Sequence, residues 1–203
     1  MKKYAIVYNT GKVETCDSWN ECKRRTHGVS GVRFKGFESD VEMNQWIHGQ
    51  TSNTALSIDT VSRSKDYNCI YVDGSFQKHC NGYAGWGFVH MKADTIISQC
   101  NGLTPVLATS RNIDGEMYAT LRALEYIKTQ TIDQYIIVHD YLGISQWLLE
   151  LWKNSKDTKY VNDCISLYKS LIISGYDIPF IHVRGHRDVK GNLIADQLAT
   201  SAK

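Results

Sequence analysis

The sequence predicts an α/β protein in which a mixed five-stranded sheet is flanked by helices and preceded by a small α/β module. Three strand-like runs follow one another after residue 67, and later strands alternate with helices, which requires parallel pairing in the second half. Residues 48–65 are rich in Ser, Thr, Asn and Asp and have no sustained period. We therefore expect an N-terminal module at 1–47, a linker at 48–65 and a main domain at 66–203.

The main domain is predicted to run in the order β, β, β, α, β, α, α, β, α. Short apolar and β-branched runs bounded by Gly or Asp predict its strands, and Met117, Leu121 and Leu124 lie at helical spacing on its first helix. The strands are expected at 68–75, 85–91, 95–101, 134–140 and 177–185, and the helices at 115–129, 143–152, 160–173 and 191–203. In this order the first and fourth strands are expected to be parallel neighbours.

The N-terminal module is predicted to contain strands at 3–9 and 31–37 and helices at 18–26 and 39–47. Both helices begin with a capping box, because Ser18 is followed three residues later by Glu21 and Ser39 by Glu42.

Composition excludes several classes of protein. With 42% hydrophobic residues the 203-residue chain can bury a core, and a net charge of +2 excludes a polycation built for indiscriminate nucleic-acid binding. Residues 1–47 hold eight Lys or Arg against six acids, so the basic excess lies at the front. The six cysteines contain no CxxC pair, which favours reduced thiols. No signal-peptide core or membrane-length apolar run occurs, so we expect a cytoplasmic protein without membrane contact.

Four acids mark a candidate site. Asp73 and Asp140 lie at the ends of two strands predicted to be neighbours, Glu116 opens the first long helix, and Asp196 lies within the last helix. Such a cluster repels itself unless a cation binds in it, and hard oxygen ligands without His or Cys suit Mg²⁺ or Mn²⁺.

The segments around these acids resemble a known family. "YVDGS", "SRNIDGEMYATLRAL", "VHDYLGISQW" and "HVRGHRDVKGNLIADQLA" look like the four catalytic blocks of ribonuclease H of type 1, with spacings of 43, 24 and 56 residues between the acids. The front segment "YAIVYNTGKVETCDSWNECKRRTHGVSGVRFKGF" is similar to the viroplasmin-like module, or hybrid-binding domain, of one branch of that family.

The resemblance implies a ribonuclease H-like fold and an endonuclease that hydrolyses the RNA strand of RNA/DNA hybrids, leaving 5′-phosphate and 3′-hydroxyl ends. It implies that two Mg²⁺ ions, or Mn²⁺ in their place, are held by the four acids. His186 in "RGHRD" would assist product release or proton transfer. The acids and this histidine are Asp73, Glu116, Asp140, Asp196 and His186.

Substrate contacts are also implied by the resemblance. Gly74, Ser75 and Asn112 would lie at the minor groove, where the 2′-hydroxyl distinguishes RNA, and Ser110 and Arg111 would lie near phosphate.

In the front module, Trp19 and Lys35 are expected to contact an RNA/DNA hybrid or double-stranded RNA. The alternative is that Trp19, Phe34 and Phe37 form the core of the module, and we expect this for Phe37. Trp147, in the main domain, is also expected to be a core residue.

Each acid has an ordinary alternative: Asp73 as a turn former, Glu116 as a first-turn acid and Asp196 as an exposed helix residue. His186 has one too, as a solvated loop histidine. At the level of function, the alternative is a non-catalytic protein that binds hybrids or double-stranded RNA on the same scaffold.

Three departures from the family pattern accompany the resemblance, one of them in the front module, where Gly36 stands at a position that often carries a second polar or basic residue. No Lys-rich helix and loop stands between Asp140 and His186, and Asn192 and Leu193 occupy the region where many relatives carry a Glu. The sequence predicts no oligomeric state.

Overall fold

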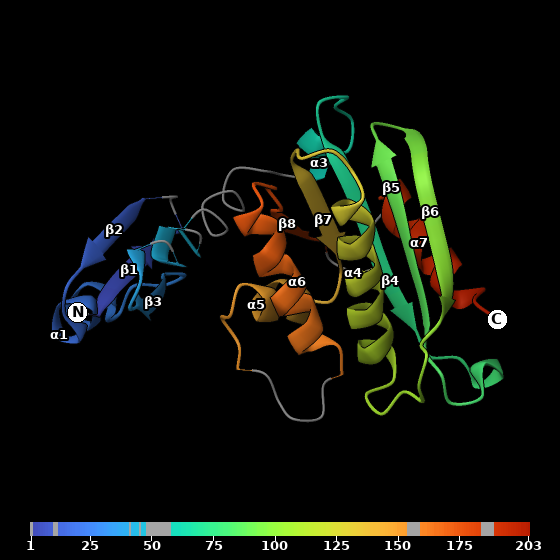
Figure 1. Cartoon of the computed structure of the whole chain (residues 1–203), viewed down its shortest axis with the longest axis horizontal. Helices are drawn as coiled ribbons and strands as arrows, with labels where there is room; N and C mark the ends of the chain where they lie inside the picture. The colour runs from blue at the N-terminus through green and yellow to red at the C-terminus, as the bar shows by residue number, and fades with distance from the viewer. Residues whose placement is uncertain are drawn as a thin grey trace. The chain divides into compact units, whose positions relative to one another are not determined.

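A computed structural model of the chain describes residues 2–9, 12–40, 42–44, 46–47, 58–153, 159–183 and 189–203 (Figure 1). The chain forms two compact units, Met1–Leu56 and Ser57–Lys203, and each is described by itself. No helix in these described ranges is long and apolar enough to cross a membrane.

Unit 1 is built on a three-stranded antiparallel sheet in the order β2-β1-β3. Its elements are β1 (Lys3–Val7), β2 (Val13–Cys16), α1 (Trp19–Thr26) and β3 (Arg33–Phe37), and residues 42–44 and 46–47 are helical. Strand β2 was not predicted, because the four residues VETC carry a charge and no clear apolar alternation. Pairing with β1 makes this segment a strand, which is a tertiary effect.

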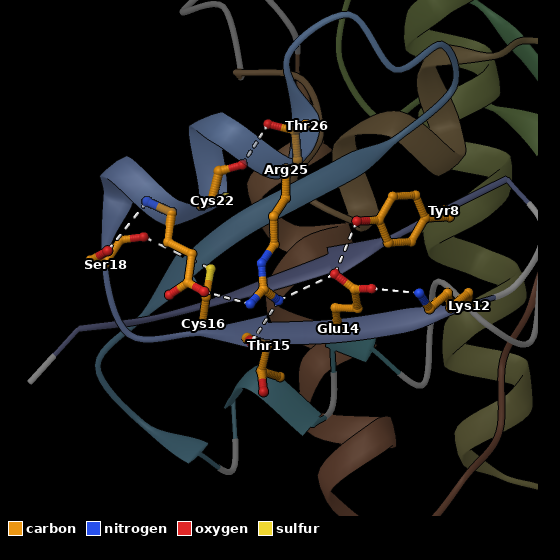
Figure 2. Close-up of polar contacts among 10 residues, drawn as sticks. Tyr8, Lys12, Glu14, Thr15, Cys16, Ser18, Cys22, Arg25 and Thr26 are labelled. Carbon is orange, nitrogen blue, oxygen red and sulfur yellow. Dashed lines mark hydrogen bonds and ion pairs between the residues drawn. The ribbon is translucent and has the colours of Figure 1, made fainter.

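Helix α1 is fixed to the sheet of unit 1 by polar contacts (Figure 2). The hydroxyl of Ser18 accepts the backbone N–H of Glu21 at 3.2 Å, which confirms Ser18 as the N-cap. The guanidinium of Arg25 donates to Glu21 on its own helix and to Glu14 of β2, where the distance is 3.2 Å. Glu14 also accepts from the hydroxyl of Tyr8 at 3.1 Å. The helix that carries Trp19 is therefore held in one orientation on the strands.

Unit 2 contains a five-stranded sheet in the order β6-β5-β4-β7-β8. Strands β4 and β7 are parallel, as are β7 and β8, while β5 pairs antiparallel with both β4 and β6. The predicted order of the main strands and helices is confirmed from residue 68 onward, as is the parallel pairing of the first and fourth strands. The elements are α3 (Ile58–Val61), β4 (Asn68–Ser75), η1 (Lys78–Cys80), β5 (Gly85–Lys92), β6 (Thr95–Leu103), α4 (Asn112–Lys128), β7 (Tyr135–His139), α5 (Gly143–Leu148), α6 (Val161–Ile173), β8 (Phe180–His182) and α7 (Lys190–Thr200).

Helices cover both faces of this sheet (Figure 1). Side chains alternate along β5, so that Trp86 and Phe88 join the core cluster under α4, while Gly85 and Gly87 face α7. A Cβ on Gly87 would lie 2.6 Å from the Cβ of Leu198, so the glycine allows α7 to pack close to the strand. All eight residues of β4 are buried, as expected for a central strand covered on two faces.

Several predicted boundaries differ from the structure, among them the start of β8, which lies at Phe180 instead of 177. Helix α3 lies inside the stretch expected to be a linker, and its Val61 is fully buried and accepts a hydrogen bond from the thiol of Cys69. Helix α5 ends at Leu148 instead of continuing to 152. Glu150 there has a φ of +55°, and the N–H groups of Leu151 and Trp152 both turn back to the carbonyl of Gln146.

Candidate active site

Asp73 of β4 and Asp140, which directly follows β7, lie at matching positions on neighbouring parallel segments. The register of β4 and β7 pairs Tyr71 with Val138, and each aspartate lies two residues further along the chain. Parallel strands run about 4.8 Å apart. The sheet therefore brings two carboxylates, 67 residues apart in the chain, to the same edge.

Glu116 reaches this edge from the second turn of α4, where Gly74 of β4 and Gly115 of α4 allow the helix to approach the strand. A Cβ on Gly74 would overlap the backbone nitrogen of Glu116, and a Cβ on Gly115 would lie 3.0 Å from the Cα of Gly74. The backbones of strand and helix thus pack directly against each other. Only glycine at both positions permits the spacing that places Glu116 beside Asp73.

The three carboxylates form one cluster. Asp73, Glu116 and Asp140 each offer an oxygen, and these oxygens lie within 4.8 Å of one another. Asp73 is 7% exposed and Glu116 6%. Burial, followed by the charge of Asp140, raises the pKa of Asp73 to about 7. Burial and the charges of Asp73 and Asp140 raise the pKa of Glu116 well above its ordinary value. Without a cation, the cluster is electrostatically unfavourable at neutral pH.

The cluster fits a divalent metal ion. Oε2 of Glu116 is buried and has no hydrogen-bond partner among the described residues, so a strong acceptor there has an unused coordination position. One oxygen of Asp73 accepts the backbone N–H of Gly74 at 2.7 Å, which fixes the orientation of that carboxylate. The donors are hard oxygens, as Mg²⁺ and Mn²⁺ prefer.

Asp196 lies on α7, is exposed, and is not a member of the three-carboxylate cluster. Its charge is nevertheless among the causes that raise the pKa of Asp73. Alternation along β4 puts Asp73 on the same side of the strand as Tyr71, whose ring occupies the space of a side chain on Gly191 of α7. Helix α7, which carries the fourth acid, therefore packs on the side of β4 to which Asp73 points. His186 lies outside the described residues.

The residues expected to contact substrate in unit 2 fall into two groups. Gly74 and Ser75 are buried in β4, and the hydroxyl of Ser75 accepts from the side-chain amide of Gln77 at 3.0 Å. Ser110 is partly exposed, and Arg111 and Asn112 are exposed in the turn that leads into α4. The backbone carbonyl of Asn112 lies 2.8 Å from the position of a Cβ on Gly74, so this turn borders the cluster.

Unit 1 exposes an aromatic pair. Trp19 is 46% exposed and Phe34 40%, and their ring centroids are 5.7 Å apart. Phe37 is buried, as expected, and the ammonium of Lys35 lies 5.5 Å from its ring centroid. The alternative that all three aromatic residues form the core is therefore wrong for Trp19 and Phe34. Sequence reasoning did not single out Phe34 as a surface aromatic, although alternation along β3 puts Phe34 and the buried Phe37, three residues apart, on opposite faces of the strand.

Two further residues near the site are structural. Trp147 is 7% exposed, which confirms it as a core residue. His139, next to Asp140, is fully buried, and one of its ring nitrogens, Nδ1, lies 2.9 Å from the carbonyl oxygen of Tyr141. Burial lowers the pKa of His139 to about 3, so this imidazole is neutral at physiological pH.

Comparison with known proteins agrees with this geometry. The family model described as RNase H matches residues 65–203, and the model described as Ribonuclease H1 N-terminal domain matches residues 15–47. Ribonuclease H1 of Homo sapiens is 24% identical over 90% of this chain and 82% of the human protein. Ribonuclease H of Ruthia magnifica subsp. Calyptogena magnifica is 30% identical over 66% of this chain and 92% of that protein.

Solved structures share the fold of unit 2. The RNase H1 of the halophilic archaeon Halobacterium salinarum NRC-1 has a TM-score of 0.53 at 22% identity, covering 67% of this chain and 96% of that one. LC11-RNase H1 in complex with an RNA/DNA hybrid has a TM-score of 0.53 at 18% identity, covering 66% of this chain and 95% of that one. At these identities the likeness concerns the fold alone. Because the RNase H model spans more than half of the sequence, the chain belongs to the ribonuclease H family.

Proposed function

We propose that this protein is an endonuclease that hydrolyses the RNA strand of RNA/DNA hybrids and leaves 5′-phosphate and 3′-hydroxyl ends. The observation that carries the proposal is the cluster of the buried Asp73 and Glu116 with the half-buried Asp140, whose oxygens lie within 4.8 Å of one another in a chain of the ribonuclease H family. A binder without catalysis would have no need to bury two acids beside a third that repels them.

The residues that would hold metal ions are Asp73, Glu116, Asp140 and, from α7, Asp196. Two Mg²⁺ ions, or Mn²⁺, would supply an activated water and stabilise the leaving 3′ oxygen when bound. The protein's own contribution is orientation: the N–H of Gly74 fixes Asp73, and the close packing of β4 and α4 fixes Glu116. Burial of Asp73 and Glu116 limits competing water. We assign to His186 a part in product release or proton transfer.

Recognition of the hybrid would combine the two units. Beside the cluster, Gly74, Ser75 and Asn112 would meet the minor groove, and Ser110 and Arg111 a phosphate. In unit 1, Trp19 and Lys35 would contact the hybrid, with double-stranded RNA as a second ligand. LC11-RNase H1, which has the same fold, was solved with an RNA/DNA hybrid, and this supports the choice of substrate. The exposure of Trp19 supports its part.

We also propose that the protein acts in the cytoplasm. All six cysteines carry free thiols in this structure, as expected in a reducing compartment. Fractionation of cells that express the chain, followed by immunodetection, tests the location.

The test of function is cleavage of a hybrid labelled at the 5′ end of its RNA strand. We expect internal cuts in that strand with Mg²⁺, none with EDTA, and none in duplex DNA or single-stranded RNA of the same sequence. Asp140→Asn should abolish cleavage and keep hybrid binding, because the amide removes a charged metal ligand but leaves the fold intact.

The matched control is Asp163→Asn, which changes an exposed acid in the first turn of α6. It should cleave at the wild-type rate. Binding of the hybrid by the wild-type protein without cleavage in Mg²⁺ or Mn²⁺ would favour the non-catalytic alternative instead.

A further inference from the structure

Asp114 is a buried carboxylate that lies outside the three-acid cluster. It is fully buried in the first turn of α4, two residues before Glu116. Its Oδ2 accepts the backbone N–H of Thr109 at 2.7 Å and that of Ser110 at 2.9 Å. The carboxylate therefore reaches back across the start of the helix and binds the turn that precedes it. Hydrogen bonds to an ionised acceptor are stronger than those between neutral groups.

The turn held in this way has an unusual backbone. Arg111 has a φ of +51° and a ψ of −120°, and the N–H of Ile113 donates to the carbonyl of Ser110 at 3.1 Å. These features define a type II′ turn with Arg111 at its first central position, which normally requires glycine. A residue with a side chain stays in this conformation only where its surroundings hold it.

The side chains presented by the turn belong to the proposed substrate contacts. Arg111 and Asn112 are exposed, whereas Asp114 beneath them is buried. Without the constraint at Thr109 and Ser110, Arg111 would relax to negative φ, and the direction of both exposed side chains would change. The turn thus orients groups at the edge of the carboxylate cluster.

Glu116 is placed by a different interaction. Its position depends on the backbone contact of Gly74 with Gly115, which does not involve the side chain of Asp114. Loss of that side chain is therefore expected to affect the turn more than the cluster.

A second element also meets Asp114. Oδ1 of Asp114 and the hydroxyl of Tyr160, which precedes α6, are both buried without a hydrogen-bond partner among the described residues. Burial and then the charge of Asp114 raise the pKa of Tyr160 to about 12. Tyr160 also packs on Tyr118 of α4 with ring centroids 4.8 Å apart. The carboxylate is thus enclosed by α4, the turn and the start of α6.

We propose that Asp114 is a positioning residue for substrate binding: its carboxylate holds the turn at 109–113 in the conformation that directs Arg111 and Asn112 toward the nucleic-acid strand. This inference rests on the proposed function of the adjacent cluster and adds to it a determinant of substrate affinity.

The kinetic test uses Asp114→Ala in the full chain at saturating Mg²⁺. We expect KM for the hybrid to rise about tenfold, which corresponds to about 1.4 kcal/mol, with kcat within about threefold of wild type. Asp114→Asn keeps an oxygen that can accept the same two N–H groups, so its KM should lie within about threefold of wild type.

The matched control is Ile127→Ala, which removes a fully buried side chain more than three turns further along α4. It should lower the melting temperature without changing KM. An equal rise of KM in this control and in Asp114→Ala would overturn the inference, as would a fall of kcat in Asp114→Ala with KM unchanged.

Amide hydrogen exchange gives a readout that needs no activity. In the free wild-type protein the amides of Thr109 and Ser110 should exchange at least about tenfold more slowly than unprotected amides. Exchange of both at the unprotected rate in the wild type would overturn the inference even if Asp114→Ala did not fold.

The same samples separate this inference from the proposed function. Absence of hybrid cleavage by the wild type would overturn the function alone. Addition of hybrid in EDTA should then still shift the amide signals of Arg111 and Asn112 in the wild type and much less in Asp114→Ala. Equal shifts in the two proteins would overturn the role of Asp114.

Discussion

Gly74 of β4 and Gly115 of α4 pack backbone against backbone: a Cβ on Gly115 would lie 3.0 Å from the Cα of Gly74 and 2.5 Å from the carbonyl oxygen of Gly85. This contact brings the helix close enough to the strand for Glu116 and Asp73 to share one cluster. The geometry of the acids therefore depends on two residues without side chains.

Gly115→Ala is expected to destabilise the protein by about 2–4 kcal/mol and to remove activity, because the new methyl group meets backbone atoms that have no room to move. This change in stability is opposite in sign to the effect of helix propensity, which favours alanine over glycine by about 1 kcal/mol. Urea denaturation and hybrid cleavage measure the two effects.

Gly102→Ala serves as the comparison, since the atoms nearest to its Cβ would belong to the side-chain ring of Trp86, the first at 3.2 Å, and not to the backbone. It should cost less stability and leave cleavage intact. A Gly115→Ala protein with wild-type stability would show that α4 and β4 can separate without consequence.

Asp73→Asn is expected to stabilise the metal-free protein at pH 8 while abolishing activity. The pKa of Asp73, about 7 in the folded state, is raised above its ordinary value. Between these two values the folded state binds a proton that the unfolded state does not, so stability is lost as pH rises through this window. The asparagine side chain does not ionise, so Asp73→Asn does not lose stability in this way as pH rises. Melting temperatures in EDTA at pH 5 and pH 8 measure the difference.

From pH 5 to pH 8, the melting temperature of the wild-type protein should fall further than that of Asp73→Asn. Asp163→Asn should behave as wild type. If Asp73→Asn melted below wild type in EDTA at pH 8, the repulsion among the three acids would not be the dominant effect.

Added Mg²⁺ is expected to raise the melting temperature of the wild-type protein, because a ligand that binds only the folded state stabilises it, by about 2.7 kcal/mol at one hundred times its Kd. The rise should be larger at pH 8 than at pH 5.5, since protons compete for the carboxylates. Differential scanning fluorimetry at constant ionic strength measures it. An equal rise in Asp140→Asn would place the binding elsewhere.

Trp19→Ala is expected to weaken hybrid binding about tenfold, or about 1.4 kcal/mol, with kcat at saturating substrate unchanged. Lys35→Ala should also weaken binding and reduce the slope of log K against log salt by about 0.9, the value for one phosphate contact. Fluorescence anisotropy at several salt concentrations measures both.

Lys12→Ala is the matched control, because Lys12 is an exposed lysine of the same unit whose ammonium pairs with Glu14 at 2.6 Å. It should leave affinity and salt slope near wild type. Deletion of residues 1–47 should weaken binding and processivity and preserve the cleavage chemistry. Unchanged affinity in the deletion variant would contradict a role of unit 1 in binding.

Much of the fold could be predicted because local sequence patterns indicate most of its strands and helices. The apolar period of α4 and the β-branched runs of β4 and β7 depend on neighbouring residues alone, and the order of elements then implied the parallel pair that brings Asp73 and Asp140 together. Strand β2 could not be found in this way, since its four residues become a strand only by pairing with β1. The end of α5 at Leu148 likewise depends on a local reversal at Glu150 that periodicity does not encode.

The sequence by itself determined the class of fold, the order of the main strands and helices from residue 68 onward and the four acids as candidates, because periodicity and residue chemistry are local properties. Tertiary structure alone decided that Asp73, Glu116 and Asp140 form the tight cluster while Asp196 lies outside it on α7. It also decided that Trp19 and Phe34 are exposed and that Asp114 accepts a hydrogen bond from the turn before α4. The physical reason is that burial, close backbone approach and hydrogen bonds between separate elements arise from packing, which depends on the whole chain at once.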